Sequence, residues 1–126
     1  MTLLKKRSNY LNKREIGASY EEIAAIKLQE LGYMIIEKNF YCKGGEIDII
    51  AKNEEYLCFI EVKYRSDDSE GDPLEAVDAR KIKRICSSAL FYMTKNAYPE
   101  TTPVRFDVVS ILGDDIKIIK NAFDYI

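Results

Sequence analysis

Two carboxylates and a lysine lie at a spacing that could bind a divalent cation and act on a phosphodiester bond. Twelve residues separate Asp48 from Glu61, and Lys63 follows two positions later. Mg²⁺ prefers carboxylate and carbonyl oxygens, binds phosphate oxygens and lowers the pKa of its bound water. We therefore expect Asp48, Glu61 and the Val62 backbone carbonyl to bind Mg²⁺ or Mn²⁺. Lys63 would orient the attacking water or stabilise the developing charge.

The plainer alternative for these residues is an ordinary salt-bridged cleft. Charged residues make up 32% of the chain, so acids and lysines at this spacing also occur by chance. In that case Lys63 neutralises Asp48 or Glu61 and the group has no catalytic role.

The sequence contains no histidine, which excludes several classes of enzyme. Serine hydrolase triads, cysteine-histidine nucleophiles, histidine-ligated zinc sites and nucleases with a histidine acid or base all need an imidazole. Carboxylate, lysine, tyrosine and metal chemistry remain.

A β-hairpin must bring the two acids together. Residues 46–52 and 56–65 alternate strongly, as strands do, and Lys52-Asn53-Glu54-Glu55 between them is turn-like. If Asn53-Glu54 is a two-residue turn, the register places Asp48 diagonal to Glu61 on one face, with their Cβ atoms roughly 7 Å apart. A four-residue turn keeps the two acids on one face, whereas a three-residue turn without a bulge separates them.

A third acid comes from an amphipathic helix expected over residues 13–31 and ended by Gly32. Its buried stripe consists of Ile16, Tyr20, Ala24, Leu28 and Leu31. Glu21 lies at the edge of that stripe and points inward, whereas Glu22 points to solvent. An inward carboxylate needs a partner. That partner is either the metal site, reached directly or through water, or a lysine or backbone amide at the helix border.

The remaining pattern completes an α/β fold. We expect a strand over residues 33–41, a helix over residues 79–95, and two final strands over residues 104–111 and 116–120. The order of elements is then αβββαββ. The strand at 56–65, the helix and the strand at 104–111 form a βαβ unit, which makes these two strands parallel and the sheet mixed.

Candidate phosphate contacts come from basic residues near the start of the second helix and at the end of the preceding strand. The net charge of −2 argues against a protein that coats nucleic acid through charge alone. Cations at a helix N-terminus oppose the helix dipole, which favours an anionic partner for them. An ordinary solvated face is the alternative. The residues concerned are Arg65, Lys81, Lys83 and Arg84.

The length of 126 residues indicates one domain, over residues 13–126, preceded by a flexible basic arm at residues 1–12. We expect no association with a membrane, because no run of about 18 apolar residues occurs. The first ten residues are too polar for a signal peptide, so we expect a cytoplasmic protein. Three widely spaced cysteines in apolar surroundings predict buried free thiols in place of a zinc site or a disulfide.

Several stretches of the chain closely resemble the YraN-like family of small bacterial proteins. That family is similar to archaeal Holliday-junction resolvases of the PD-(D/E)xK restriction-endonuclease-like superfamily. The resemblance covers nearly all of residues 13–123. Its most specific parts are Gly45-Glu46-Ile47-Asp48-Ile49-Ile50-Ala51 and Phe59-Ile60-Glu61-Val62-Lys63-x-Arg65, and it extends to Gly17-x-x-Tyr20-Glu21-Glu22-x-Ala24, Glu75-Ala76-Val77-Asp78 and Val104-Arg105-Phe106-Asp107-Val108-Val109.

The resemblance implies a restriction-endonuclease-like three-layer α/β/α core. It also implies a Mg²⁺-dependent nuclease site at Glu21, Asp48, Glu61 and Lys63. One departure is Tyr20, which stands where the family usually has glycine just before the helix glutamate.

The function expected from these observations is a metal-dependent endonuclease that acts on DNA. Branched and single-stranded forms met in recombination or repair are the candidate substrates. A nuclease of this size that cuts two strands symmetrically would pair with a second copy, so a homodimer is also a candidate. The first alternative is a nucleic-acid-binding or scaffold protein that keeps the fold and does not cut. The second is a hydrolase of small nucleotides.

Overall fold

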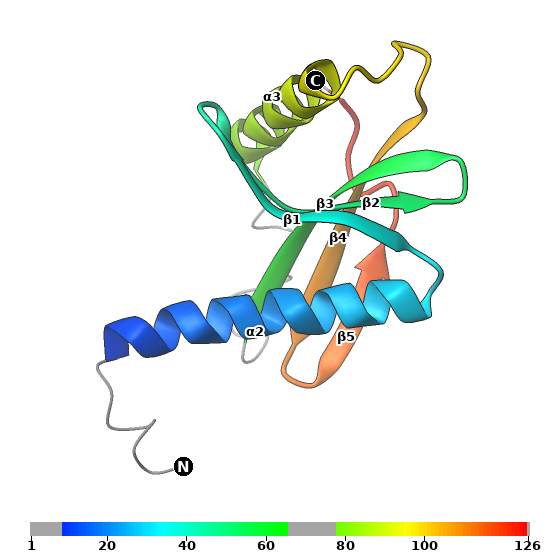
Figure 1. Cartoon of the computed structure of the whole chain (residues 1–126). Coiled ribbons are helices and arrows are strands. Elements are labelled where there is room, and N and C mark those ends of the chain that lie inside the picture. Colours follow the sequence, from blue (N-terminus) through cyan, green and yellow to red (C-terminus); the bar gives the residue numbers. More distant parts are fainter. Residues whose placement is uncertain (1–8, 66–77, 126) are drawn as a thin grey trace.

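The computed structural model describes residues 9–65 and 78–125 and confirms the predicted order αβββαββ (Figure 1). Strand and helix bounds agree with the predicted ones to within a residue or so, except at the first helix. The elements are α2 (Asn9–Glu30), β1 (Met34–Cys42), β2 (Gly45–Asn53), β3 (Tyr56–Arg65), α3 (Ala79–Lys95), β4 (Val104–Leu112) and β5 (Asp115–Ile119).

The five strands form one mixed sheet in the order β1-β2-β3-β4-β5. β3 and β4 are parallel, as the βαβ unit with α3 predicts, and the other neighbouring pairs are antiparallel. β1 and β5 are therefore the edges of the sheet, and β3 lies at its centre.

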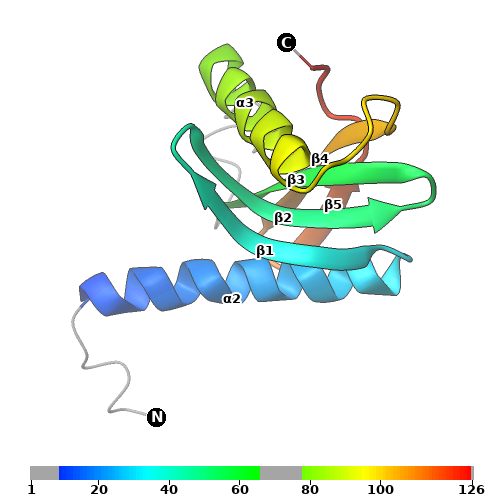
Figure 2. The ribbon, with the colours of Figure 1, turned by 45° about the horizontal axis from the view of Figure 1, so that its top comes forward.

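One helix covers each face of the sheet, which gives the expected three layers. Ala24, Ala25 and Leu28 of α2 pack on one face and Ile85, Ala89 and Tyr92 of α3 on the other, so the core is divided into two clusters. Figures 1 and 2 show α2 running along one side of the sheet and α3 crossing the opposite side. Within the described residues, neither helix is long and apolar enough to cross a lipid bilayer.

The first helix differs from the prediction at both ends. It begins at Asn9, so residues 9–12 of the predicted arm are helical, and residues 1–8 lie outside the described residues. The prediction of Leu31 in the buried stripe is wrong, because its side chain is 50% exposed. The helix ends at Glu30, and Gly32, with φ of 93°, turns the chain so that the Tyr33 N–H bonds to the Leu28 carbonyl. Leu31 is thereby carried away from the core.

The β2–β3 turn lies within the turn-like stretch of residues 52–55, but the two-residue turn considered at Asn53-Glu54 is wrong. Asn53 pairs with Tyr56, so the turn is Glu54-Glu55, and Glu54 has φ of 57°. Asn53 stays in the sheet because its buried side chain accepts a hydrogen bond of 2.7 Å from Arg105 Nη2. The shift of the turn changes the register by two residues, which preserves the faces of both strands.

All three cysteines are free thiols in the described structure, as predicted. Cys58 and Cys86 are buried, and Cys42 is half-buried with its Sγ 3.4 Å from Ser88 Oγ. Burial raises the pKa of the Cys58 thiol to about 12, which makes it unreactive.

Candidate active site at the fork between β2 and β3

The strands β2 and β3 part at Asp48. Their pairing ends at Ile49 with Ile60, and we call the opening beyond this pair the fork. Ile49 packs in the cluster under α2, but Ile47 packs in the cluster under α3. Residues two apart on a regular strand share a face, so β2 changes face at Asp48.

The neighbouring strand is irregular at the same level. β1 pairs with β2 through Lys38 with Ile49 and Phe40 with Ile47, which leaves Asn39 facing Asp48. Asn39 has φ of 55°, a left-handed conformation that asparagine tolerates better than most residues. The irregularity in both strands lets the β1–β2 hairpin bend away from β3 toward α3, as Figure 1 shows.

The fork brings Asp48 and Glu61 together. One step beyond the last pair, the register places Asp48 directly opposite Glu61, not diagonal to it as predicted. Asp48 Oδ2 accepts a hydrogen bond of 2.8 Å from the backbone N–H of Val62. Burial raises the pKa of the Asp48 carboxyl to about 7, the charge on Glu61 adds to the rise, and the Val62 bond opposes it. The two acids therefore share one electrostatic environment.

Two lysines neutralise Glu61, whose side chain is buried. Its Oε1 atom lies 3.2 Å from Lys63 Nζ and 2.6 Å from Lys81 Nζ. The pKa of Lys63 is lowered by burial and by the adjacent Lys81, and raised in part by Glu61. Glu61 is therefore ion-paired with Lys63, as in the salt-bridged alternative. Lys81, predicted only as a phosphate contact, lies within the carboxylate site.

Glu21 reaches the same site from α2. It is half-buried, whereas Glu22 is exposed and lies 3.0 Å from Lys38, in agreement with the predicted inward and outward directions. Burial raises the pKa of Glu21, a side-chain hydrogen bond with Asn39 lowers it, and the charges of Glu46 and Glu61 raise it further.

Sequence reasoning missed Asn39 and Glu46. Glu46 adds to the negative charge felt by both Asp48 and Glu21. Its place in the Gly45-Glu46-Ile47-Asp48 stretch could have drawn attention to it. Asn39 gives no comparable signal, because a single asparagine in a strand reads as a surface residue.

The donor atoms at the fork suit a hard cation such as Mg²⁺, since Asp48, Glu61 and Glu21 all offer carboxylate oxygens. Within residues 9–65 and 78–125, however, no three acidic or cysteine side chains are gathered closely enough to hold a metal ion. Glu61 directs its oxygen to Lys63 and Lys81. A metal ion at this site would therefore compete with a lysine for Glu61.

The basic residues of α3 border two hollows, of which the first shares Lys81 with the carboxylate site. Lys81 and Arg84 line a hollow of about 420 Å³ together with Tyr41, Gly45, Glu46 and Ile85. Arg80, Lys83 and Arg84 line a second, of about 620 Å³, with Gly44 and Ser87. Lys83 and Arg84 are exposed, and Arg65 is half-buried at the end of β3. Three of the four predicted phosphate contacts thus lie together on α3.

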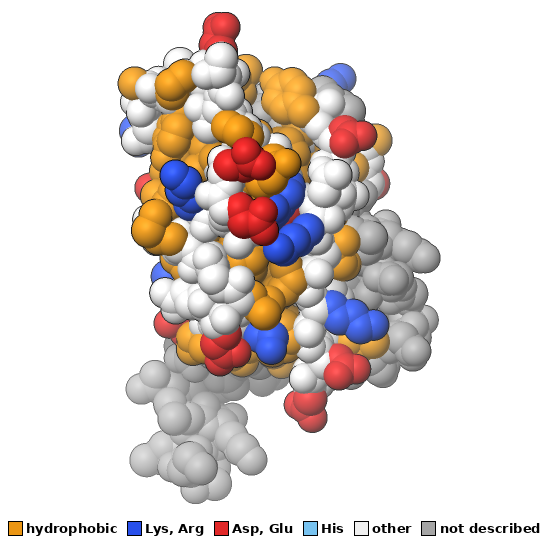
Figure 3. All heavy atoms as spheres, turned by 90° about the vertical axis from the view of Figure 1, so that its right-hand side faces the viewer, with side chains coloured by type: hydrophobic (Ala, Val, Ile, Leu, Met, Phe, Trp, Pro, Cys, Tyr) orange, Lys and Arg blue, Asp and Glu red, His pale blue; other side chains and the backbone are white. Residues whose placement is uncertain are grey.

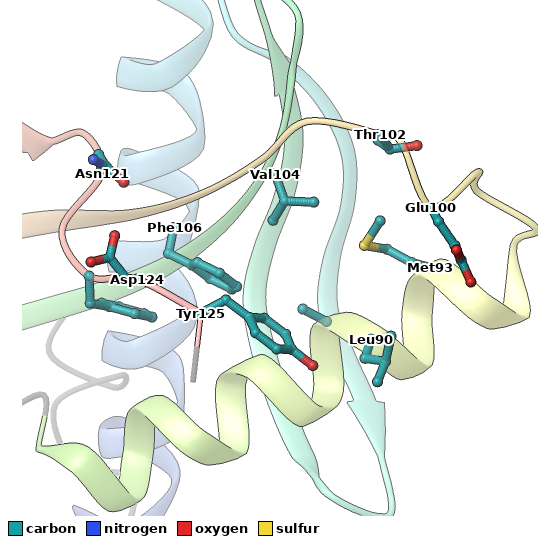
Figure 4. Close-up of a pocket in the computed structure, with 11 residues that line it drawn as sticks. Leu90, Met93, Glu100, Thr102, Val104, Phe106, Asn121, Asp124 and Tyr125 are labelled. Carbon is teal, nitrogen blue, oxygen red and sulfur yellow. The ribbon is translucent and has the colours of Figure 1, made fainter.

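An apolar cavity of about 220 Å³ lies elsewhere, between α3 and the C-terminal segment (Figure 4). Leu90, Met93, Phe106 and Tyr125 line it, and Glu100 and Asp124 add negative charge. Among the described residues around it none is lysine or arginine, so it does not suit a phosphate group.

The side of the molecule that contains the β2–β3 turn has no single sign of charge. Figure 3 shows acidic and basic side chains interspersed with hydrophobic ones on this side, which is the right-hand side of Figure 1. The start of α3, which carries Arg80, Lys81, Lys83 and Arg84, lies away from this side.

Comparisons with known proteins agree with the resemblance noted from the motifs. The model of the uncharacterised protein family UPF0102, which is the YraN family, matches residues 20–111. A UPF0102 protein of Lachnoclostridium phytofermentans is 47% identical over 114 residues, which cover 90% of this chain and 97% of that protein. A UPF0102 protein of Clostridium botulinum strain 657 is 44% identical over 121 residues, covering 91% and 98% of the two chains. The chain belongs to the UPF0102 family.

Proposed function

We propose that this protein is a metal-dependent nuclease that hydrolyses phosphodiester bonds in DNA. The observation that carries the proposal is the meeting of Asp48 and Glu61 at the fork, with Lys63 bonded to Glu61. Two acids and a lysine at neighbouring strands are what the resemblance to the PD-(D/E)xK superfamily implies for a Mg²⁺ site. A shared fold alone would not identify the activity, so the proposal depends on these side chains.

Each residue has a distinct role in this proposal. Asp48 and Glu61 would hold Mg²⁺ or Mn²⁺, with the Val62 carbonyl and with Glu21 directly or through water. The bound ion would supply a Lewis acid for a phosphate oxygen and a more acidic water. Lys63 orients the attacking water or stabilises the charge that develops on the phosphate.

DNA is the proposed substrate because cations gather beside the site. Lys81 and Arg84 line the hollow that includes Glu46, and Lys83 lines the second hollow, which shares Arg84 with the first, so a phosphate backbone that passes the fork would meet these cations. Arg65, at the end of β3, is a further candidate contact. Branched and single-stranded DNA are the candidate forms.

The test is cleavage of four-way junction, single-stranded and duplex DNA by the purified protein in Mg²⁺ or Mn²⁺. Asp48→Ala and Lys63→Ala should each lower the rate by about 10²-fold or more, because each removes a group that acts on the reacting phosphate. Lys52→Ala is the control, since Lys52 is exposed at the other end of β2. Cleavage that persists in both site variants would contradict the proposal.

The alternative is a nucleic-acid-binding or scaffold protein that does not cut. The ion pairs of Glu61 with Lys63 and Lys81 favour it, because they neutralise a predicted metal ligand. In that case the wild type binds the same DNA with a steep salt dependence, and neither Mg²⁺ nor Mn²⁺ produces cleavage.

A further inference from the structure

Lys81 lies at the boundary between the carboxylate site and the basic hollow. Its Nζ atom is 2.6 Å from Glu61 Oε1, and the same side chain lines the hollow shared by Tyr41 and Arg84. Its side chain is 36% exposed, whereas that of Glu61 is 8% exposed. Lys81 can therefore leave Glu61 for the solvent side of the hollow without any movement of the core.

The backbone of Lys81 is fixed, whereas its side chain can rotate once the ion pair with Glu61 opens. Asp78 caps α3, and its Oδ1 accepts a hydrogen bond of 2.9 Å from the Lys81 N–H. The lysine side chain has several rotatable bonds beyond this anchored position. Only the ammonium group needs to move between Glu61 and a ligand in the hollow.

We propose that Lys81 makes metal binding and DNA binding depend on each other, because it holds Glu61 in the metal-free protein and pairs with a DNA phosphate once Glu61 binds metal. This inference rests on the proposed nuclease function. An ammonium 2.6 Å from Glu61 Oε1 repels a divalent cation at the same carboxylate, and Lys81 is the more exposed of the two lysines there, at 36% against 21% for Lys63. A phosphate between Lys81 and Arg84 draws the Lys81 ammonium away, and so lowers this repulsion.

The coupling is reciprocal. If DNA raises the affinity for metal by removing Lys81 from Glu61, then metal must raise the affinity for DNA by the same factor. Lys63, the less exposed of the two lysines, stays beside Glu61 in both arrangements, at 3.2 Å from Oε1 in the metal-free one. Lys63 and Lys81 thus neutralise Glu61 in the metal-free protein, and bound DNA favours the metal-bound site.

The test is a Mn²⁺ titration followed by electron paramagnetic resonance, with and without a four-way DNA junction whose phosphorothioate linkages resist cleavage. In the wild type the junction should tighten Mn²⁺ binding about threefold or more. Lys81→Met should bind Mn²⁺ about threefold or more tightly without DNA, and the junction should add little. Lys52→Met removes the same charge from the far end of β2 and should behave as the wild type.

Glu61→Gln separates failure of this inference from failure of the proposed function. Suppose that Glu61→Gln weakens Mn²⁺ binding but Lys81→Met binds Mn²⁺ no more tightly than the wild type without DNA. This result would overturn the role of Lys81 and leave the proposed metal site intact. The role of Lys81 is also overturned if the junction tightens Mn²⁺ binding equally in the wild type and in Lys81→Met. If Glu61→Gln binds Mn²⁺ as tightly as the wild type does, both the proposed metal site and the role of Lys81 are overturned.

Discussion

Asp48 is destabilising when it is charged in the metal-free protein. Burial and the charge on Glu61 raise the pKa of its carboxyl to about 7, above the ordinary value of an unfolded aspartate near 4. Between these two values the folded protein binds a proton that the unfolded chain does not. Stability therefore falls as the pH rises through this window, and the loss is complete above about pH 7.

Asp48→Asn should remove this part of the pH dependence. Relative to the wild type, the variant should gain about 1 to 3 kcal/mol in free energy of unfolding between pH 5 and pH 8. Urea unfolding in EDTA at several pH values measures the difference. Glu22→Gln is the control, because Glu22 is exposed and its gain should be small. Parallel pH profiles for Asp48→Asn and the wild type would show that Asp48 is not perturbed by its surroundings.

Single residues also show where sequence reasoning works and where it stops. The meeting of Asp48, Glu61 and Lys63 is predictable because strand alternation fixes the face of each side chain. The partners of Glu61 could not be predicted in the same way, since Lys81 comes from a helix that packs over the sheet. The contribution of Asn39 was hidden for a related reason, because its left-handed φ accompanies the bend of the β1–β2 hairpin, which no local pattern indicates.

At the scale of elements, the β2–β3 hairpin contains an unfavourable turn conformation. Glu54 has φ of 57°, which costs a residue with a Cβ atom about 1 kcal/mol and costs glycine little. Glu54→Gly should therefore raise the free energy of unfolding by about 0.5 to 1 kcal/mol, measured by urea denaturation. Lys120 lies 3.9 Å from Glu54, but this exposed pair contributes little.

Glu55→Gly is the matched control for the turn. Glu55 is also exposed, and it has no positive φ, so glycine there should be neutral or destabilising through the entropy of the unfolded chain. A turn at Asn53-Glu54, as predicted from the sequence, would not give this contrast between the two positions. Stabilisation by Glu55→Gly but not by Glu54→Gly would contradict the observed turn.

The hairpin explains why the site was predicted with the wrong turn. A register shift of two residues preserves the face of every side chain, so Asp48 and Glu61 stay together in either register. Local sequence could not choose between the two turns, because the choice depends on a distant contact. Arg105 bonds to Asn53 and also to Asp107, and this buried cluster holds Asn53 in the sheet.

At the scale of the whole molecule, the α/β class and the order of elements followed from periodicity, turns and caps. Apolar stripes and strand alternation are local properties, so they are readable without contacts. The second helix illustrates this, because a helix over residues 79–95 was expected and α3 has these bounds, with Asp78 Oδ1 accepting a hydrogen bond from the Lys81 N–H at its start. The bend at Asp48 and the hollows beside α3 result from packing between distant segments, and no local pattern encodes them.

The distribution of charge leads to the last prediction. The protein has a net charge of −2, so the proposed binding of nucleic acid requires a local cluster of cations. Arg80, Lys83 and Arg84 form that cluster at the start of α3, beside the hollow of about 620 Å³. Replacing all three with glutamine should weaken DNA binding and reduce the salt slope by about one for each phosphate that is no longer neutralised.

Fluorescence anisotropy with a labelled DNA junction between 50 and 200 mM salt, about the range in which such contacts are resolved, measures both quantities. Replacement of Lys52, Lys117 and Lys120 with glutamine is the control. These lysines are exposed and lie outside α3, and their replacement changes the net charge by the same amount. Equal losses of affinity in both triple variants would mean that DNA responds only to the overall charge. A loss confined to the α3 variant means that DNA lies along the start of α3, which places its phosphates next to Lys81 and the fork.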